Sequence, residues 1–339
     1  MAALSQRRET ILRIIVGEYI TSATPVASES IVRGYSLGIS PATARLEMAR
    51  LEEEGYITRP HVSAGGIPSP KGYRYYVECL LKEAKLGDEE QRVIRQLFYQ
   101  VGQQLEEWAR LAVTVLSQRL RNIALVTLPR SQECHFRHLD LVALQEFLVL
   151  SVLLLQEGQI KQQLVALEQA MSQDGLTALA NQLNTLYKGL TCSQIGGRET
   201  ELSAVEEQIT VAIMQIMEAE DRQQPDQFYL DGWRHLISQP EFRGERILGL
   251  VEALEERHIL NSLLDSLGDE SETRVTIGDE NKETVLQDCS VILSNYGACA
   301  GIRGVIGVIG PTRMPYSRVI PTVDYLSSIM GGLLSEMYD

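Results

Sequence analysis

The spacing of apolar residues near the N-terminus predicts two short helices. Apolar side chains recur every three or four positions from Ile11 to Ile20, which is the period of a helix with one buried face. The stretch from Thr21 to Pro25 interrupts this pattern, and a second helix is expected from about Val26 to Arg33. The two helices and the break between them predict the first part of a helix-turn-helix arrangement.

A third helix and a hairpin are expected next. Ser40 is a suitable N-cap, Pro41 fits the first helical position, and Gly55 stands where a helix C-terminus is expected. Two short strands are predicted over Tyr56–Arg59 and Ile67–Pro70, because a turn-rich stretch separates them. Helices followed by such a hairpin have the outline of a winged helix.

The rest of the chain alternates between predicted helices and short apolar strands. An aromatic-rich helix over 71–81 leads to a long amphipathic helix over about 88–121, which we expect to be a connector. Strands are predicted at 123–127, 136–144, 147–155, 159–167, 274–278, 291–295 and 304–310, and helices at 172–188, 199–219, 241–267 and 316–337. Strands that flank a block of helices predict one α+β domain with a helical insertion near 189–231.

Length and charge separate an N-terminal domain from a larger body. The 339 residues are enough for two or three domains. The chain has 31 Lys and Arg against 45 Asp and Glu, and this net charge of −14 excludes a uniformly basic protein that binds nucleic acid or membranes. Residues 1–85 hold 11 basic and 9 acidic side chains, so the remainder holds 20 and 36. A nearly neutral domain therefore precedes a strongly acidic body.

Cysteine usage and hydropathy favour the cytoplasm. Five scattered cysteines without CxxC spacing indicate reduced thiols. The longest apolar stretch, Phe147–Leu155, is nine residues long, whereas a membrane-spanning helix needs roughly 20. Arg13 interrupts the only apolar region that could act as an N-terminal signal. We therefore expect a cytoplasmic protein without membrane contact.

The predicted third helix has the most informative surface. Ala44, Met48 and Leu51 share one face and are expected to lie in the core. The opposite face is small, apolar and cationic, and comprises Ala42, Leu46, Ala49 and Arg50, with Thr43 and Arg45 at its margins. Such a helix can enter a DNA major groove, where Arg binds guanine and small apolar groups meet thymine methyls. An ordinary amphipathic surface helix is the alternative, and the acidic residues Glu47 and Glu52–Glu54 favour it.

The hairpin supplies independent support for nucleic-acid binding. No Asp or Glu occurs between Gly55 and Val77, while tyrosines are frequent there. The basic and titratable side chains of this region are Arg59, His61, Lys71 and Arg74. Cations and tyrosine hydroxyls can hold DNA phosphates. The alternative is a charge-poor turn beside a buried tyrosine stripe, and we expect Tyr75 and Tyr76 to lie in the core.

Two further clusters have weaker functional readings. Cys134, His135 and His138 beside Glu133 have a spacing that can suit zinc, but a structural site normally needs a fourth ligand, and a solvated loop is expected instead. The glycines at positions 301, 304, 307 and 310 do not match the phosphate-binding fingerprint. We expect them to allow close packing or a bulge within a strand.

The remaining patterns favour a structural role. The leucines of 176–190 and 248–264 could form partner-binding stripes, but core packing is the expectation. No Ser/His/Asp or Cys/His arrangement typical of nucleophilic catalysis is visible in the sequence. We therefore expect no enzymatic activity, no cofactor and no metal site.

Several segments spread along the chain occur in the same order in a known family. They are Tyr19-Ile20, Pro25-Val26, Ser40–Met48, Leu51–Tyr56, Pro60–Pro68, Gly72–Val77, Gly232-Trp233, Pro240–Phe242, Gly307–Tyr316 and Val319–Leu326. On these segments the chain resembles the heat-inducible transcription repressor family, HrcA. The resemblance covers essentially the whole chain, and several motifs in the right order make it specific.

The resemblance implies a fold and a function. The expected fold is α+β, with an N-terminal winged helix-turn-helix followed by a GAF-like domain that carries an inserted dimerisation segment. The expected boundaries are 1–85 for the DNA-binding domain, 86–121 for the connecting helix, 122–188 with 232–339 for the GAF-like domain, and 189–231 for the insertion. Family members bind, as homodimers, an inverted-repeat operator upstream of chaperone operons, and the chaperonin promotes repression.

The resemblance also implies residues that contact DNA. It places Thr43, Arg45 and Arg50 on the recognition helix and residues 63–66 on the wing. Together with the charge pattern, the candidate DNA-binding residues are Ser40, Thr43, Arg45, Leu46, Arg50, Arg59, His61, Ser63, Lys71 and Arg74. The chain departs from the family at Leu46, where Asn is usual, at Gly66, where Arg is common, and at 27–29, where Gly-Ser-Arg is usual.

Two other functions are open to the sequence. A metabolite-responsive regulator would hold a small molecule in its GAF-like domain, in a polar pocket near Arg303 or Arg313. An enzyme with an incidental winged helix would need a converging group of perturbed titratable residues in the body.

Overall fold

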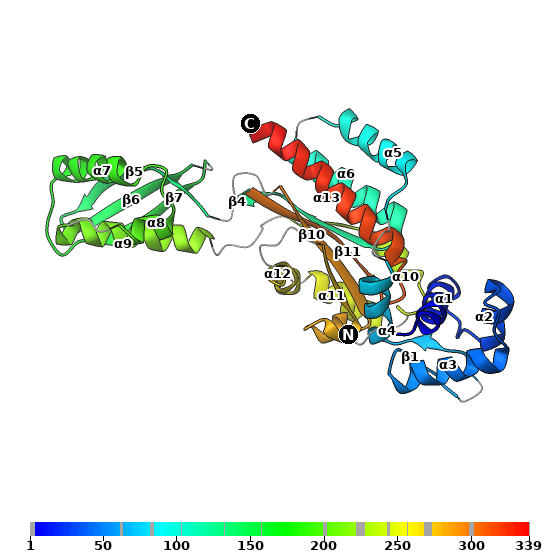
Figure 1. The fold of residues 1–339 in the computed structure, drawn as a ribbon. Helices are drawn as coiled ribbons and strands as arrows, with labels where there is room; N and C mark the ends of the chain where they lie inside the picture. The colour runs from blue at the N-terminus through cyan, green and yellow to red at the C-terminus, as the bar shows by residue number, and fades with distance from the viewer. Residues whose placement is uncertain are drawn as a thin grey trace. The chain divides into compact units, whose positions relative to one another are not determined.

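The chain folds into two compact units. The computed structural model describes residues 4–61, 64–81, 85–102, 104–131, 133–156, 158–198, 202–221, 228–242, 245–255, 257–267, 273–297 and 302–338 (Figure 1). Unit 1 comprises Met1–Pro129, Gln227–Cys299 and Gly304–Asp339, and unit 2 comprises Arg130–Asp226 and Ala300–Arg303. Within the described ranges, no helix combines the length and the apolar composition that crossing a bilayer would require.

The N-terminal part of unit 1 confirms the predicted winged helix, and we call it the head. Its elements are α1 (Gln6–Ser22), α2 (Ser28–Tyr35), α3 (Pro41–Glu53), β1 (Ile57–Thr58), β2 (Ile67–Pro68), α4 (Pro70–Tyr75) and the π-helical turn η1 (Tyr76–Leu80). Strands β1 and β2 pair antiparallel, with Ile57 opposite Pro68. Gly72 allows α4 to approach the hairpin, because a Cβ there would lie 2.1 Å from the Tyr56 carbonyl oxygen.

The rest of unit 1, which we call the body, is built on an antiparallel sheet. Its strand order is β8 (Phe228–Asp231), β3 (Ile123–Thr127), β11 (Ile302–Pro311), β10 (Cys289–Tyr296) and β9 (Arg274–Ile277). Alternate residues face opposite sides: Ala124 and Val126 join one hydrophobic cluster, whereas Ile123 and Leu125 join another. The sheet is therefore buried on both faces.

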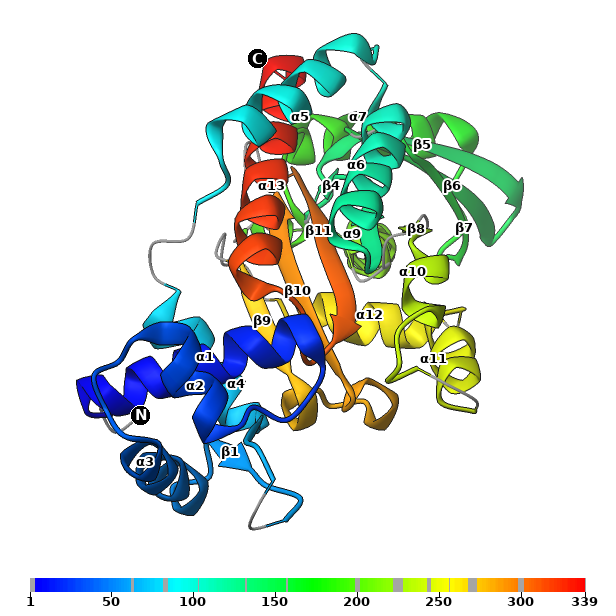
Figure 2. The ribbon, with the colours of Figure 1, turned by 90° about the vertical axis from the view of Figure 1, so that its right-hand side faces the viewer.

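Helices cover both faces of this sheet. On one side lie α6 (Leu105–Leu120) and α13 (Tyr316–Tyr338), and Figure 2 shows α13 lying alongside β10. Residues of α11 (Glu245–Glu255) and α12 (Arg257–Asp265) pack in the cluster on the other side. The short elements α10 (Trp233–Ile237), η2 (Gly278–Glu280) and η3 (Thr284–Leu286) complete the body.

The predicted connecting helix is two helices. Helix α5 (Asp88–Gln100) ends before α6 begins, because the backbone turns extended at Val101, with φ −89° and ψ 138°. Gly102 follows, and a glycine inside a helix costs about 1 kcal/mol relative to alanine, which favours a break there. Helices α5 and α6 pack against each other.

Unit 2 corrects the expected arrangement of the central strands. Strands β5 (Phe136–Gln145), β6 (Leu148–Leu155) and β7 (Ile160–Ala166) form their own antiparallel sheet, separate from that of the body. Helices α7 (Gln173–Tyr187), α8 (Cys192–Gly196) and α9 (Ala204–Asp221) share a hydrophobic core with one face of it. The separate unit thus starts near residue 130, well before the predicted insertion at 189–231, because periodicity identifies a strand and its buried face but not its sheet.

The secondary motifs of the sequence have structural roles. Gly304, Gly307 and Gly310 lie on β11, and a Cβ at any of them would come within 2.5 Å of a neighbouring atom, which confirms close packing at these three positions. Gly301 lies outside the described residues. Cys134 is buried, and its backbone N–H donates to Asp221 at 2.7 Å, so the expected solvated loop is wrong at this position. No group of three or more His, Cys, Asp or Glu side chains in the described part of the chain is placed to hold a metal ion.

The leucine-rich segments contribute mainly to the core, as expected. The buried members are Leu176, Leu179, Leu183, Leu250, Leu254, Leu260 and Leu263. Leu248 is an exception, since it is exposed on α11.

Candidate nucleic-acid interface

Helix α3 is anchored by its cap and by one apolar face. Ser40 Oγ accepts a hydrogen bond from the Thr43 N–H at 3.1 Å, and the two hydroxyl oxygens lie 3.0 Å apart. The inner residues Ala44, Met48 and Leu51 are buried, as predicted from their spacing. Ser40 and Thr43 therefore hold the start of the helix in place. This arrangement fixes the direction of the side chains that point outward.

The outer face of α3 is exposed to solvent. Leu46 is 55% exposed. Pro41, Ala42 and Arg45 are also exposed, and Arg50 keeps 51% of its side chain accessible. Arg45 has no ion pair within the described residues. The surface is small, apolar and cationic, as the sequence predicted.

The acidic residues of α3 disfavour DNA binding by its outer face less strongly than the sequence suggested. Glu47 is buried and lies among three arginines, at 3.8 Å from Arg7, 3.6 Å from Arg8 and 3.9 Å from Arg50. Two further carboxylates near the C-terminal end form ion pairs: Glu52 with Arg59 and Glu54 with Arg8. Glu47, Glu52, Glu53 and Glu54 are the four acidic residues of α3 and its C-cap. Among these four, Glu53 alone is exposed and has no ion pair with an arginine in the described part of the chain.

Arg7 and Arg8 were missed by sequence reasoning. They lie at the start of α1, about 40 residues before their partner Glu47, and no local spacing connects them. A basic pair at the start of a helix was the only available signal, and it is common on protein surfaces. The structure brings the pair to the inner side of α3, where it offsets the buried carboxylate.

A shallow hollow lies between α3, the start of α2 and the hairpin. Its volume is about 560 Å³, and its lining residues are Ala27, Ser28, Glu29, Arg45, Met48, Arg59 and Ala64. Arg45 and Arg59 thus lie on one concave surface. Glu29 adds a carboxylate to that surface.

The candidate residues of the hairpin differ in availability. His61 is exposed, and Ser63 lies outside the described residues. Arg59 keeps 12% of its side chain accessible and forms an ion pair with Glu52. Lys71 is exposed, but its Nζ donates to the Glu54 carbonyl at 2.7 Å and lies 4.5 Å from the centre of the Tyr56 ring. A Cβ at Gly66 would lie 3.0 Å from Ile57 and 3.1 Å from Met48, so a side chain there would crowd two buried residues.

Arg74, which the sequence analysis grouped with the hairpin candidates, lies apart from this surface. Its Nε donates to Glu280 at 2.8 Å, and its Nη2 donates to the Val275 carbonyl at 2.7 Å, so the guanidinium is bound to the body. The hydrogen bond to Glu280 raises the pKa of Arg74. A local run of basic and aromatic residues could not reveal a partner 206 positions away.

Two tyrosines of the same segment confirm the expected core stripe. Tyr75 and Tyr76 are buried. The Tyr75 hydroxyl donates to Glu9 at 2.6 Å, and burial together with this bond raises the pKa of Tyr75 to about 12. The Tyr75 hydroxyl is therefore used within the head.

Comparisons with known proteins agree with this arrangement. The model of the HrcA protein C-terminal domain family matches residues 106–320. A heat-inducible transcription repressor HrcA of Dehalococcoides mccartyi is 43% identical over 99% of this chain and 97% of its own length. The repressor of the same name from Chloroflexus aggregans is 38% identical over 99% and 94%.

A solved structure supports the fold. The crystal structure of a hypothetical protein covers 98% of this chain and 98% of its own, with a TM-score of 0.59 and 23% sequence identity. At this identity the likeness concerns the fold alone. The family model and the relatives at 43% and 38% identity show that the chain belongs to the heat-inducible transcription repressor family, HrcA.

Proposed function

We propose that this chain represses transcription of heat-shock (chaperone) operons by binding an inverted-repeat operator as a homodimer. The observation that carries the proposal is the exposed, cationic outer face of α3 on a winged-helix head, in a chain whose relatives are heat-inducible transcription repressors. In winged-helix and related domains the helix at this position enters the major groove. The relatives are named as transcription repressors, and we propose no catalytic activity for this chain.

Arg45, Leu46 and Arg50 are the proposed readers of the operator. An arginine can bind guanine through two hydrogen bonds, and an apolar side chain can pack against a thymine methyl. Arg45 is available without breaking an ion pair, whereas Arg50 must leave Glu47 at 3.9 Å. Arg59, His61, Ser63 and Lys71 are proposed as phosphate contacts that position the head.

An open apolar sheet face supports pairing of two copies through unit 2. On β5, β6 and β7, Val142, Leu150 and Leu164 form one cross-strand row on the face that α7 and α9 leave uncovered. Val142 and Leu164 are 42% and 57% exposed, and Ile160 nearby is 62% exposed. An uncovered apolar face of this kind commonly marks a protein interface. A second copy is the proposed occupant, since an inverted repeat requires two identical readers.

A role for the chaperonin follows from the family resemblance and is proposed on that basis. A partner that binds only the folded repressor raises its population by mass action. Depletion of free chaperonin during heat stress would then lower the amount of active dimer. Adding purified chaperonin to a DNA titration should raise the fraction of repressor that binds.

The metabolite-sensing alternative has less support. Arg313 was one of two residues expected near a ligand pocket, but its guanidinium is bound to Glu241 and to the Ile20 carbonyl. The enzyme alternative needs converging perturbed groups. The strongly shifted groups include Tyr296, Tyr316 and Cys289, whose pKa values are raised mainly by burial, as expected for core residues.

The experiment is a fluorescence-anisotropy titration with a duplex from the region upstream of the source organism's chaperone operon, against a scrambled duplex, at several salt concentrations. The proposal is supported if the protein binds the inverted-repeat duplex more tightly than the scrambled duplex and keeps this preference as the salt concentration rises. Equal affinity for both duplexes contradicts it.

Leu164→Glu tests the dimer by sedimentation, with Asn181→Asp on the exposed side of α7 as the charge control. Leu164→Glu should sediment as a monomer, and a dimer that persists would reject this interface.

A further inference from the structure

Three motifs far apart in the sequence meet where the head joins the body. They are Gly72–Val77 in the head, Pro240–Phe242 before α11, and Gly307–Tyr316 from β11 to α13. The resemblance to the family rests partly on these motifs, yet none of them lies on the outer face of α3. Their shared feature is the joint between head and body, which lies within unit 1. The joint contains two arginine contacts and a tyrosine pair.

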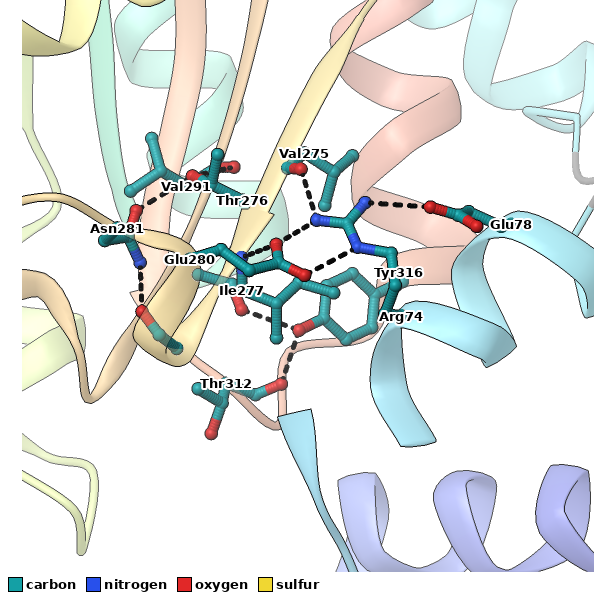
Figure 3. A network of polar contacts seen from close by, with 12 residues as sticks. Arg74, Glu78, Val275, Thr276, Ile277, Glu280, Asn281, Val291, Thr312 and Tyr316 are labelled. Carbon is teal, nitrogen blue, oxygen red and sulfur yellow. Dashed lines mark hydrogen bonds and ion pairs between the residues drawn. The ribbon is translucent and has the colours of Figure 1, made fainter. Parts of the chain in front are cut away.

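The first contact is a socket for Arg74 (Figure 3). Its guanidinium forms two bonds with the Glu280 carboxylate and a third with the Val275 carbonyl, and Glu78 lies 3.7 Å away. The Ile277 N–H donates to Glu280 at 2.8 Å, so the carboxylate is held by its own turn as well as by the arginine. A forked cation bound by a fixed carboxylate and a carbonyl has little freedom to rotate.

The socket rests on a second hydrogen-bonded turn of the body. Asn281 donates from Nδ2 to the carbonyls of Gly278 and Leu286, both at 2.9 Å, and its Oδ1 accepts from Thr276 at 2.8 Å. Asn281 is buried, so these bonds are shielded from water. The turn that presents Glu280 is therefore ordered by contacts that do not involve the head.

The second contact ties α1 to the start of α13. Arg313 forms an ion pair with Glu241 and donates to the Ile20 carbonyl at 3.2 Å. Between the two arginines, the ring centres of Tyr73 and Tyr316 lie 5.8 Å apart. The Tyr316 hydroxyl donates to the Thr312 carbonyl at 2.6 Å. The head is thus held through α1 and through α4, and two separated attachments resist rotation better than one.

We propose that this joint fixes the orientation of the head on the body, and that Arg74 and Arg313 are positioning residues for operator binding rather than DNA contacts. The inference rests on the proposed function, because orientation matters only when two heads must reach two half-sites at once. Binding of the second head is favoured by a high effective concentration, which falls when the geometry is no longer held. Loosening the joint should therefore weaken binding to two half-sites and leave binding to one half-site unchanged.

The test compares duplexes with two half-sites and with one, using the full chain. Arg74→Ala and Glu280→Gln are the variants, and exposed Arg95 on α5 supplies the control Arg95→Ala. Glu280→Gln keeps an acceptor for the Ile277 N–H but removes the charge, so it should fold normally. Each variant is expected to lose about tenfold or more on the two-site duplex and less than about twofold on the single site. The double variant Arg74→Ala/Glu280→Gln should bind the two-site duplex no more weakly than Arg74→Ala alone, because the two changes break the same contact.

The dependence on salt separates positioning from contact. If Arg74 held a phosphate, its loss would lower the slope of log affinity against log salt by about 0.9 on a single half-site. The proposal expects an unchanged slope there. Equal losses on both duplexes, or wild-type affinity of Arg74→Ala and Glu280→Gln on both, would overturn it. Failure of the wild-type protein to prefer the inverted repeat would instead reject the proposed function.

Discussion

Replacing Arg45 with alanine tests how the operator is read. Arg45 is exposed on the outer face of α3 and has no ion pair within the described residues, so its removal should not destabilise the head. Surface changes of this kind usually alter the free energy of unfolding by less than about 0.5 kcal/mol. An effect on DNA binding would therefore report the contact with DNA.

The magnitude follows from the number of contacts. A bidentate arginine–guanine contact contributes about 1–3 kcal/mol to discrimination, and a dimer loses two of them. Arg45→Ala should thus cost about 2–6 kcal/mol on the inverted repeat, or roughly 30-fold to more than 10⁴-fold in affinity. Arg50→Ala should cost less, because Arg50 already interacts with Glu47 at 3.9 Å in the free protein.

The assay is anisotropy with the inverted repeat and with duplexes changed at single base pairs. The variant should lose discrimination at one symmetric pair of positions and keep it elsewhere. A uniform loss across all duplexes would make Arg45 a phosphate contact. Unchanged affinity, with Arg95→Ala as the matched arginine control, would refute the assignment of α3 as the reading helix.

Three further variants test the local reasoning. Ser40→Ala should lower the free energy of unfolding by about 0.5–2 kcal/mol in chemical denaturation, because the N–H of Thr43 loses its acceptor; an unchanged midpoint would refute the cap. Tyr73→Phe should leave the protein equally stable or stabilise it by up to about 2 kcal/mol in the same assay, because the buried Tyr73 hydroxyl has no hydrogen-bond partner in the described structure; a clear destabilisation would contradict this. Burial raises the pKa of Asp324, against the opposing effect of the Thr273 hydrogen bond, so the folded chain holds this proton more tightly than the unfolded chain does. Because Asp324 also keeps exposed surface, the shift is tested directly and not through stability: an NMR titration of the full chain, with Asp324→Asn to assign the signal, should place the pKa of Asp324 above the ordinary 3.8, and a value at or below 3.8 would contradict this.

Local patterns predicted most elements of the fold. The N-cap at Ser40 and the buried spacing of Ala44, Met48 and Leu51 are confirmed because both depend on neighbours within a few residues. Most strands of the body and of unit 2 were also predicted close to their observed bounds, but β8 of the body was missed. Their distribution between two sheets was not, since strand pairing depends on residues far apart in sequence.

The candidate site shows the same limit. The outer face of α3 could be predicted from helical periodicity alone, including exposed Leu46. The roles of Arg74 and Glu47 could not, because the partners of each lie in distant segments. A basic residue near tyrosines looks the same in sequence whether it faces DNA or a carboxylate of its own chain.

The central claim is that two copies of this chain place one α3 each in successive major grooves of an inverted repeat. Hydroxyl-radical footprinting of the operator duplex with the full chain tests it most directly. The account predicts two protected patches, related by the twofold axis of the repeat and centred whole helical turns apart, at about 34 Å or a multiple of it. Protection of a single patch, or protection that ignores the repeat, would contradict the account.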